Sequence, residues 1–245
     1  MEKDTKKAIL EFGGAILLIA LVIGGLLFLT RDKGVTDAEK FKAEYEALNG
    51  TVRQSDGATY NEIKIDQNNP IKYVSAKEAI EVLESDAAIM YIGAPWCPWC
   101  RNGVPVLFEL AKKYKVDTIY YIELDDIKSN YEVQNGKLMK TKSGTEDYYA
   151  LLDKLSDRLD DYVITGEDGQ KYDTGEKRVY MPYVVAVNGG KVVADKVGTV
   201  TLDANQTKYD KLTDEQHEKL TETYGNLFDL AFKNPDGACD EEGCN

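Results

Sequence analysis

The sequence predicts an α/β domain with a central mixed sheet, preceded by a membrane-spanning helix. Three observations lead to this fold class. Apolar β-like runs alternate with helical patterns in the middle of the chain, and strands joined through a helix lie parallel. The turn Asn188-Gly189-Gly190 joins two later apolar runs and predicts an antiparallel hairpin. An uncharged apolar stretch near the start is long enough to cross a bilayer.

The first element is this apolar stretch, which we expect to be an uncleaved membrane anchor over residues 12–30. At about 1.5 Å per residue its uncharged part spans roughly 27 Å, close to the thickness of a bilayer core. A cleaved signal peptide is the alternative, but no small-residue cleavage site follows the run. The basic residues before the span favour a cytoplasmic segment 1–11 and a globular part outside the cytoplasm.

Residues 31–60 are predicted to form a linker and an N-terminal extension with one helix, over 38–48. Thr36 or Asp37 is placed to cap that helix, and apolar side chains recur along it at helical spacing.

Two strands and a helix are predicted next. Apolar and polar residues alternate over 61–66, and a second β-like run covers 71–74. Ser75 then begins a helix over 76–84, because Glu78 stands three residues later and completes a capping box.

The most informative segment is Trp96-Cys97-Pro98-Trp99-Cys100, between a predicted strand over 87–92 and a predicted helix over 101–114. The unpaired N–H groups and the dipole of a helix N-terminus favour a thiolate on the first cysteine. The two-residue gap lets the second cysteine resolve a mixed disulfide. The motif therefore predicts a redox pair.

Zinc binding is the main alternative for this motif, and a purely structural disulfide is the other. A zinc site of this type needs a second ligand pair. Cys239 and Cys244 lie far away on an acidic tail, and His217 stands alone in a charged segment. A disulfide closing so short a loop would stabilise the fold little. We expect neither a metal nor a cofactor.

The second half of the chain interrupts and then resumes the alternation. Residues 127–175 break it, and they include an amphipathic pattern that predicts a helix over 146–162, with Tyr149, Leu152 and Leu159 on one face. The other elements expected here are strands over 118–124, 179–187 and 191–197, a helix over 213–232 and a flexible acidic tail over 234–245.

Composition restricts the partners and the compartment. The chain has 43 acidic against 30 basic residues and a net charge of −13, which argues against nucleic acid because phosphate binding needs clustered cations. All four cysteines fall into two close pairs, as expected in an oxidising compartment.

Three segments resemble the thioredoxin superfamily. Residues 94–100 resemble its active-site turn, residues 181–187 its cis-proline strand, and residues 188–198 the hairpin and glycine that follow. The resemblance implies a thioredoxin-like three-layer sandwich over residues 61–233. Within it, residues 127–177 would form a helical insertion.

The resemblance also implies roles for individual residues. Cys97 matches the nucleophilic cysteine and Cys100 the resolving one. Pro182 matches the cis-proline whose neighbouring backbone pairs with the substrate chain like an added strand, and Met181 would line that groove.

The two tryptophans of the motif are further candidates for substrate binding. Trp96 would pack beside the site, or it is an ordinary core aromatic. Trp99 would present a flat apolar face to client proteins, or it is an ordinary surface residue.

The chain departs from the family where many thioredoxins bury an aspartate near a lysine. Here Tyr91 stands at the first position and the second falls near Tyr121, so these places offer no buried carboxylate to take a proton from the resolving thiol. The dipeptide between the cysteines is Pro-Trp, which matches neither the Gly-Pro of reductases nor the Pro-His of strong oxidases. The direction of electron flow stays open.

We therefore expect a membrane-anchored thiol-disulfide oxidoreductase whose partners are cysteine-containing secreted or surface proteins and a membrane or thioredoxin-type redox protein. The alternative is a non-enzymatic client-binding module with a structural disulfide. Cys239 and Cys244 form either a second redox pair or a small disulfide loop. We favour the loop, because the acidic residues between them disfavour a thiolate.

The predicted topology can be tested by labelling. A membrane-impermeant maleimide added to intact cells after mild reduction should label Cys97, because the globular part is expected outside the cytoplasm. Labelling that appears only after lysis would reject this topology.

Overall fold

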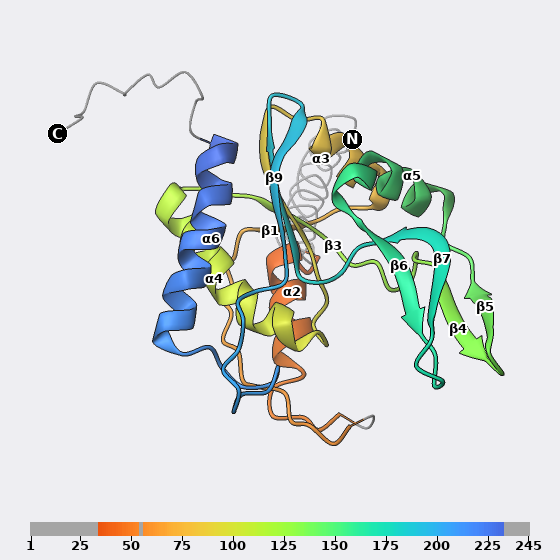
Figure 1. Cartoon of the computed structure of the whole chain (residues 1–245). Helices are drawn as coiled ribbons and strands as arrows, with labels where there is room; N and C mark the ends of the chain where they lie inside the picture. The colour runs from red at the N-terminus through yellow and green to blue at the C-terminus, as the bar shows by residue number, and fades with distance from the viewer. Residues whose placement is uncertain (1–33, 54–55, 233–245) are drawn as a thin grey trace, which may run out of the picture. The chain divides into compact units, whose positions relative to one another are not determined.

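The computed structural model describes residues 34–53 and 56–232 (Figure 1). The chain divides into two units, residues 1–36 and residues 37–245. The predicted anchor over 12–30 and the tail with Cys239 and Cys244 lie outside the described residues. Among the helices that are described, none has the length and apolar character needed to cross a membrane.

A five-stranded mixed sheet forms the centre of the second unit. Three neighbouring strands on one side of the sheet, β1 (Ile71–Tyr73), β3 (Ile119–Ile122) and β2 (Ala87–Ile92), are parallel to one another. The last two, β8 and β9, run antiparallel, and they are joined at Gly189 and Gly190, whose positive φ angles suit a residue without a side chain. The predicted mixed sheet is confirmed. In spatial order its strands are β1 (Ile71–Tyr73), β3 (Ile119–Ile122), β2 (Ala87–Ile92), β8 (Tyr183–Asn188) and β9 (Lys191–Val197).

Helices cover both faces of this sheet, which gives three layers (Figure 1). Successive side chains of β2 point to opposite faces: Ile89 and Tyr91 enter one core, and Met90 and Ile92 enter the other. Because both faces are buried, the strand is apolar almost throughout. The first face is covered by α2 (Asp37–Glu46), α4 (Pro98–Tyr114) and α6 (Asp214–Phe232), and the second by α3 (Ala76–Leu83) and α5 (Glu146–Lys154).

Two predicted helices have the expected local chemistry. At the start of α3, the Ser75 hydroxyl accepts a hydrogen bond from the Glu78 N–H, and the Glu78 carboxylate accepts one from the Ser75 N–H. This capping box was predicted and is confirmed. In α2, Phe41 and Tyr45 are fully buried in the same core as the sheet. The helix of the N-terminal extension is therefore an integral part of the domain.

The predicted strand over 61–66 is wrong, although its pattern of burial is correct. Ile63 and Ile65 are buried and their neighbours are exposed. The backbone, however, pairs with side chains instead of a second strand. The Ile63 N–H and C=O bond to the Asn49 side-chain amide at 3.0 and 2.8 Å, and the Ile65 N–H donates to Glu46 at 2.8 Å. An alternating pattern reports one buried face and does not identify the hydrogen-bond partner.

The helix predicted over 146–162 is also wrong in its second half. It ends at Lys154, and a 3₁₀ turn, η1 (Ser156–Arg158), leads into a strand. Leu159 is still buried, but from Asp161 to Ile164 exposed and half-buried residues alternate with the period of a strand. The apolar residues after Lys154 thus match the helical spacing of α5 by coincidence.

The segment 127–177 is consequently not a purely helical insertion. Besides α5 it contains two antiparallel hairpins (Figure 1). Asp173-Thr174-Gly175 lies inside a strand, at a bulge where Gly175 has a φ of 74°. The hairpins are β4 (Asn130–Gln134) with β5 (Lys137–Lys142), and β6 (Asp160–Thr165) with β7 (Lys171–Arg178).

The pairing of Asn49 with the segment around Ile63 predicts a large effect on stability. Asn49→Ala should lower the free energy of unfolding by about 2–3 kcal/mol, because it removes the partner of the Ile63 N–H and C=O and one of the acceptors of the Arg101 guanidinium. Chemical denaturation followed by circular dichroism measures this. Gln67→Ala, which removes an exposed hydrogen bond to Glu39, is the control and should change the same quantity by less than about 0.5 kcal/mol. Equal effects would contradict the assignment.

Candidate functional site

The two cysteines lie at the junction of β2 and α4. Cys97 is the N-cap residue of α4, and Pro98 occupies the first helical position, where its missing N–H costs nothing. Both cysteines are free thiols. Cys97 keeps 5% of its surface exposed, whereas Cys100, one turn further in, has none. Of the two sulfurs, only that of Cys97 is placed to meet another molecule.

The surroundings give the two thiols opposite acidities. A hydrogen bond from the Cys100 thiol lowers the pKa of Cys97, and the backbone N–H groups of Cys100 and Trp99 lower it further against the effect of burial. Burial raises the pKa of Cys100 well above its ordinary value, and the nearby Cys97 adds to this. The first cysteine is therefore the more readily ionised one, and the second stays protonated.

A cis proline lies opposite the first cysteine. The Met181–Pro182 peptide bond is cis, as the resemblance implies. The Cys97 thiol donates to the Met181 carbonyl oxygen with an Sγ–O distance of 3.7 Å. The sheet fixes this approach, because Ile92, at the end of β2, is paired with Tyr183, at the start of β8. Strand β8 begins only at Tyr183, four residues later than Val179, where the sequence placed the start of the strand.

A groove lies beside Trp99, the residue that precedes Cys100. Trp99 and Met181 are both half-buried and line it, so two of the predicted substrate-binding residues are brought together. Pro182 is buried beneath the same region, and its carbonyl oxygen accepts a hydrogen bond from the Gly198 N–H at 2.7 Å. The other residues that line the groove are Gly198, Thr199, Val200 and Thr201.

Trp96 lies elsewhere. Its side chain is 38% exposed, so it is not a core aromatic, and it does not line the groove. Its indole N–H donates to the Asp125 carboxylate at 2.5 Å, and the Lys128 ammonium group lies 5.7 Å from the ring centroid. Trp96 therefore joins the cysteine motif to the beginning of the segment 127–177.

Sequence analysis did not single out Arg101, the residue that follows Cys100. Its guanidinium is buried and donates to the Tyr45 carbonyl at 2.7 Å, the Asn61 carbonyl at 2.8 Å and the Asn49 amide oxygen at 2.5 Å. Its place directly after the motif, on the inward face of a helix, was the available signal. Arg101 links the helix that carries Cys100 to α2.

Three tyrosines lie beneath the cysteines at and around the positions where the sequence departs from the family. The hydroxyl oxygens of Tyr45 and Tyr91 are 3.0 Å apart, and the rings of Tyr91 and Tyr121 are stacked. The Tyr121 hydroxyl donates to the Gly93 carbonyl at 3.2 Å. Burial raises the pKa of all three hydroxyls, so they remain neutral.

Two other groups of side chains are less closely connected to the thiols. Glu123, which follows β3, is half-buried, and burial together with Asp125 raises its pKa to about 7. His217 lies 3.3 Å from Glu109 on the surface of α6 and α4. Within residues 34–53 and 56–232, no three acidic, histidine or cysteine side chains gather in a way that would hold a metal ion.

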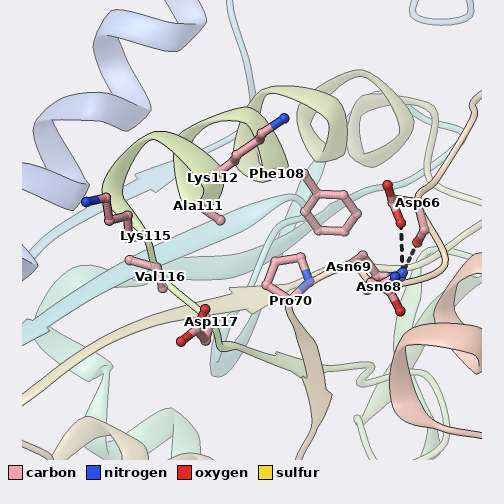
Figure 2. Close-up of a pocket in the computed structure, with 10 residues that line it drawn as sticks. All are labelled: Asp66, Asn68, Asn69, Pro70, Phe108, Ala111, Lys112, Lys115, Val116 and Asp117. Atoms are coloured by element: carbon pink, nitrogen blue, oxygen red, sulfur yellow. Dashed lines mark hydrogen bonds between the residues drawn. The ribbon is translucent and has the colours of Figure 1, made fainter.

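A separate hollow lies at the opposite end of α4 (Figure 2). Phe108, Lys112 and Lys115 line one side of it and the loop 66–70 lines the other. At about 1.5 Å per helical residue, Lys112 is roughly 20 Å along the helix from Cys97. This hollow is therefore not part of the cysteine site.

The sequence and the structure were compared with known proteins. No family model matches the sequence, and no curated protein matches it significantly. Among solved structures, oxidised thioredoxin from Plasmodium falciparum is 15% identical, with 63% of this chain and 98% of that one covered and a TM-score of 0.33. Oxidised thioredoxin O2 from Arabidopsis thaliana is 21% identical, with 54% and 85% covered and a TM-score of 0.32. Likenesses this distant do not establish an activity.

The opposite acidities of the two thiols predict selective alkylation. In the reduced native protein, iodoacetamide should modify Cys97 first, with a pH midpoint below that of an ordinary thiol, while Cys100 stays unmodified. Mass spectrometry of peptides after timed quenching measures this. Cys97→Ser is the control, in which Cys100 should react only after denaturation. Fast native alkylation of Cys100 would contradict the assignment.

Proposed function

We propose that this protein is a thiol-disulfide oxidoreductase in which Cys97 attacks and Cys100 resolves. The observation that carries the proposal is the placement of Cys97 at the N-terminus of α4, beside the cis Met181–Pro182 bond. This arrangement favours a thiolate and leaves a groove next to it.

The chemistry proceeds in two exchange steps. The Cys97 thiolate attacks one sulfur of a client disulfide, forming a mixed disulfide and releasing the first client thiolate. Cys100 then loses its proton and attacks the Cys97 sulfur. This forms the Cys97–Cys100 disulfide and releases the second client sulfur, which takes up the proton. Two electrons pass from the protein to the client, and the reverse sequence oxidises a client dithiol.

The groove supplies the means to hold a client chain. Trp99 and Met181 offer apolar surface, and we propose that an extended client segment pairs with the backbone of Met181, directly before the cis Pro182. We propose that the clients are cysteine-containing secreted or surface proteins. The support comes from the sequence: the apolar stretch over 12–30 and the pairing of the cysteines suit an anchored domain outside the cytoplasm. A membrane or thioredoxin-type redox protein would then restore the starting redox state.

The tail cysteines are proposed to be dispensable for exchange. Cys239 and Cys244 are separated by acidic residues that disfavour a thiolate, which suits a small disulfide loop. The double variant Cys239→Ser, Cys244→Ser should retain most of the exchange activity. A double variant as inactive as Cys97→Ser would show instead that the tail relays electrons to the main pair.

Trapping of clients tests the proposed function. Cys100→Ser expressed at native level should accumulate dithiothreitol-sensitive adducts on Cys97, because the group that resolves the mixed disulfide is missing. Non-reducing electrophoresis and mass spectrometry identify the adducts, and Cys97→Ser, Cys100→Ser is the control without them. Clients that need disulfides would indicate an oxidase or isomerase, and clients with catalytic thiols a reductase. If no adducts form while Cys97 remains alkylatable, a client-binding module with a structural disulfide becomes the better account.

A further inference from the structure

The second exchange step poses a problem that the cysteines alone do not solve. Cys100 has no exposed surface, and burial together with the nearby Cys97 keeps its thiol protonated. A thiol must become a thiolate before it attacks a disulfide. Water does not reach this sulfur to stabilise the negative charge. Groups of the protein have to do so.

The groups that face Cys100 come from every element packed around it. The Tyr91 hydroxyl of β2 and the backbone N–H of Ala94 lie close enough to the Cys100 sulfur to lower its pKa, against the effect of burial. Tyr45 of α2, Tyr121 of β3 and Tyr224 of α6 lie close enough for a charge on Cys100 to act on their hydroxyls. The chain continues from Cys100 into Arg101, whose hydrogen bonds all go to neutral oxygens within the described ranges. None of these neighbours is a carboxylate or an imidazole.

The Tyr91 hydroxyl is held firmly in this position. A Cβ placed on Gly93 would lie 2.3 Å from the Tyr91 oxygen, so only glycine permits the tyrosine to reach under the active-site turn. The same oxygen lies 3.0 Å from the Tyr45 oxygen. The ring of Tyr91 is fixed by stacking on Tyr121 at 5.4 Å between centroids.

We propose that the Tyr91 hydroxyl donates a hydrogen bond to the Cys100 sulfur while this sulfur attacks the mixed disulfide, and that the Tyr45 hydroxyl orients it. The inference rests on the proposed function, because it concerns the second step of that exchange. Tyr91 donates a hydrogen bond and keeps its proton, since burial holds its own pKa well above the ordinary value. The proton of Cys100 leaves with the released client sulfur. Tyr91 is thus a stabilising donor and not a general base.

Tyr45 is bound to α4, the helix that carries Cys100. The Arg101 guanidinium donates to the Tyr45 carbonyl at 2.7 Å, and Arg101 directly follows Cys100 in α4. With the Tyr45 hydroxyl on Tyr91, this contact connects Cys100, Tyr91, Tyr45 and Arg101. The first helix of the domain is therefore a positioning element for the buried thiol.

The experiment separates the two exchange steps in one trace. The reduced full-length protein is mixed with excess dithiobis-nitrobenzoate, whose coloured thiolate is released once when Cys97 attacks and again when Cys100 resolves the mixed disulfide. In the Tyr91→Phe variant the first release should stay within about twofold of wild type. The second should slow by about tenfold, with its pH midpoint about one unit higher, because a hydrogen bond to a charged group is lost.

Two further variants make the test specific. Tyr45→Phe should slow the second release by about threefold in the same direction, because it leaves Tyr91 in place without its orienting partner. Tyr148→Phe loses an equally buried hydroxyl in the other core and should change neither release. If Tyr91→Phe does not fold, Tyr45→Phe still decides the matter.

The outcomes separate failure of the role proposed for the tyrosines from failure of the proposed oxidoreductase function. A second release at the wild-type rate and pH midpoint in Tyr91→Phe and Tyr45→Phe overturns the role of the tyrosines. Equal slowing of both releases also overturns it, since that would indicate a general structural effect. A wild-type protein that shows no first release above that of Cys97→Ser would refute the proposed function itself.

Discussion

The pairing of β2 with β8 is the constraint on which the site depends. Their antiparallel register sets Ile92 opposite Tyr183, so the residues that follow β2 and the residues that precede β8 meet at the same end of the sheet. Cys97 begins a helix there, and the cis Pro182 bond ends a loop there. Neither residue would be informative alone. Together they give the sulfur a backbone partner, a helix N-terminus and a groove.

Beneath Cys100 the protein places tyrosine side chains instead of a charged group. A carboxylate beneath Cys100 would add a second negative charge to a dry interior, at a high cost in desolvation. Tyrosine hydroxyls stay neutral there, stack within the core and still donate hydrogen bonds. The same rings supply apolar packing between α2 and the sheet. Chemistry and core stability thus draw on one set of residues.

Sequence patterns predicted the central sheet, the capping box and the two cysteines because each depends on local or periodic signals. The strand expected over 61–66 is absent for a non-local reason: its backbone bonds to the side chains of Asn49 and Glu46, which lie 14 residues from Ile63 and 19 residues from Ile65. The helix expected to reach Tyr162 ends at Lys154. The apolar residues of the following turn and of β6 happen to continue the helical spacing of α5, so the pattern did not show where the helix ends. The hydrogen bonds of Arg101 and of the Tyr45 hydroxyl were not predicted, because they form only once α2 packs against α4 and β2.

The insertion leaves the central sheet at the same end of the strands as the cysteine site. It starts beyond β3, whose last residue Ile122 pairs with Ile92, and returns just before β8. Its two hairpins are joined through the Glu176 carboxylate, which accepts hydrogen bonds from Lys140, Ser129 and Tyr131. Burial raises the pKa of Glu176, but these hydrogen bonds outweigh it and lower that pKa to about 2. Trp96 binds Asp125 at the root of the insertion. One end of the insertion is thus held by Trp96, the neighbour of Cys97 in sequence, and the other end continues through residues 178–181 into Pro182.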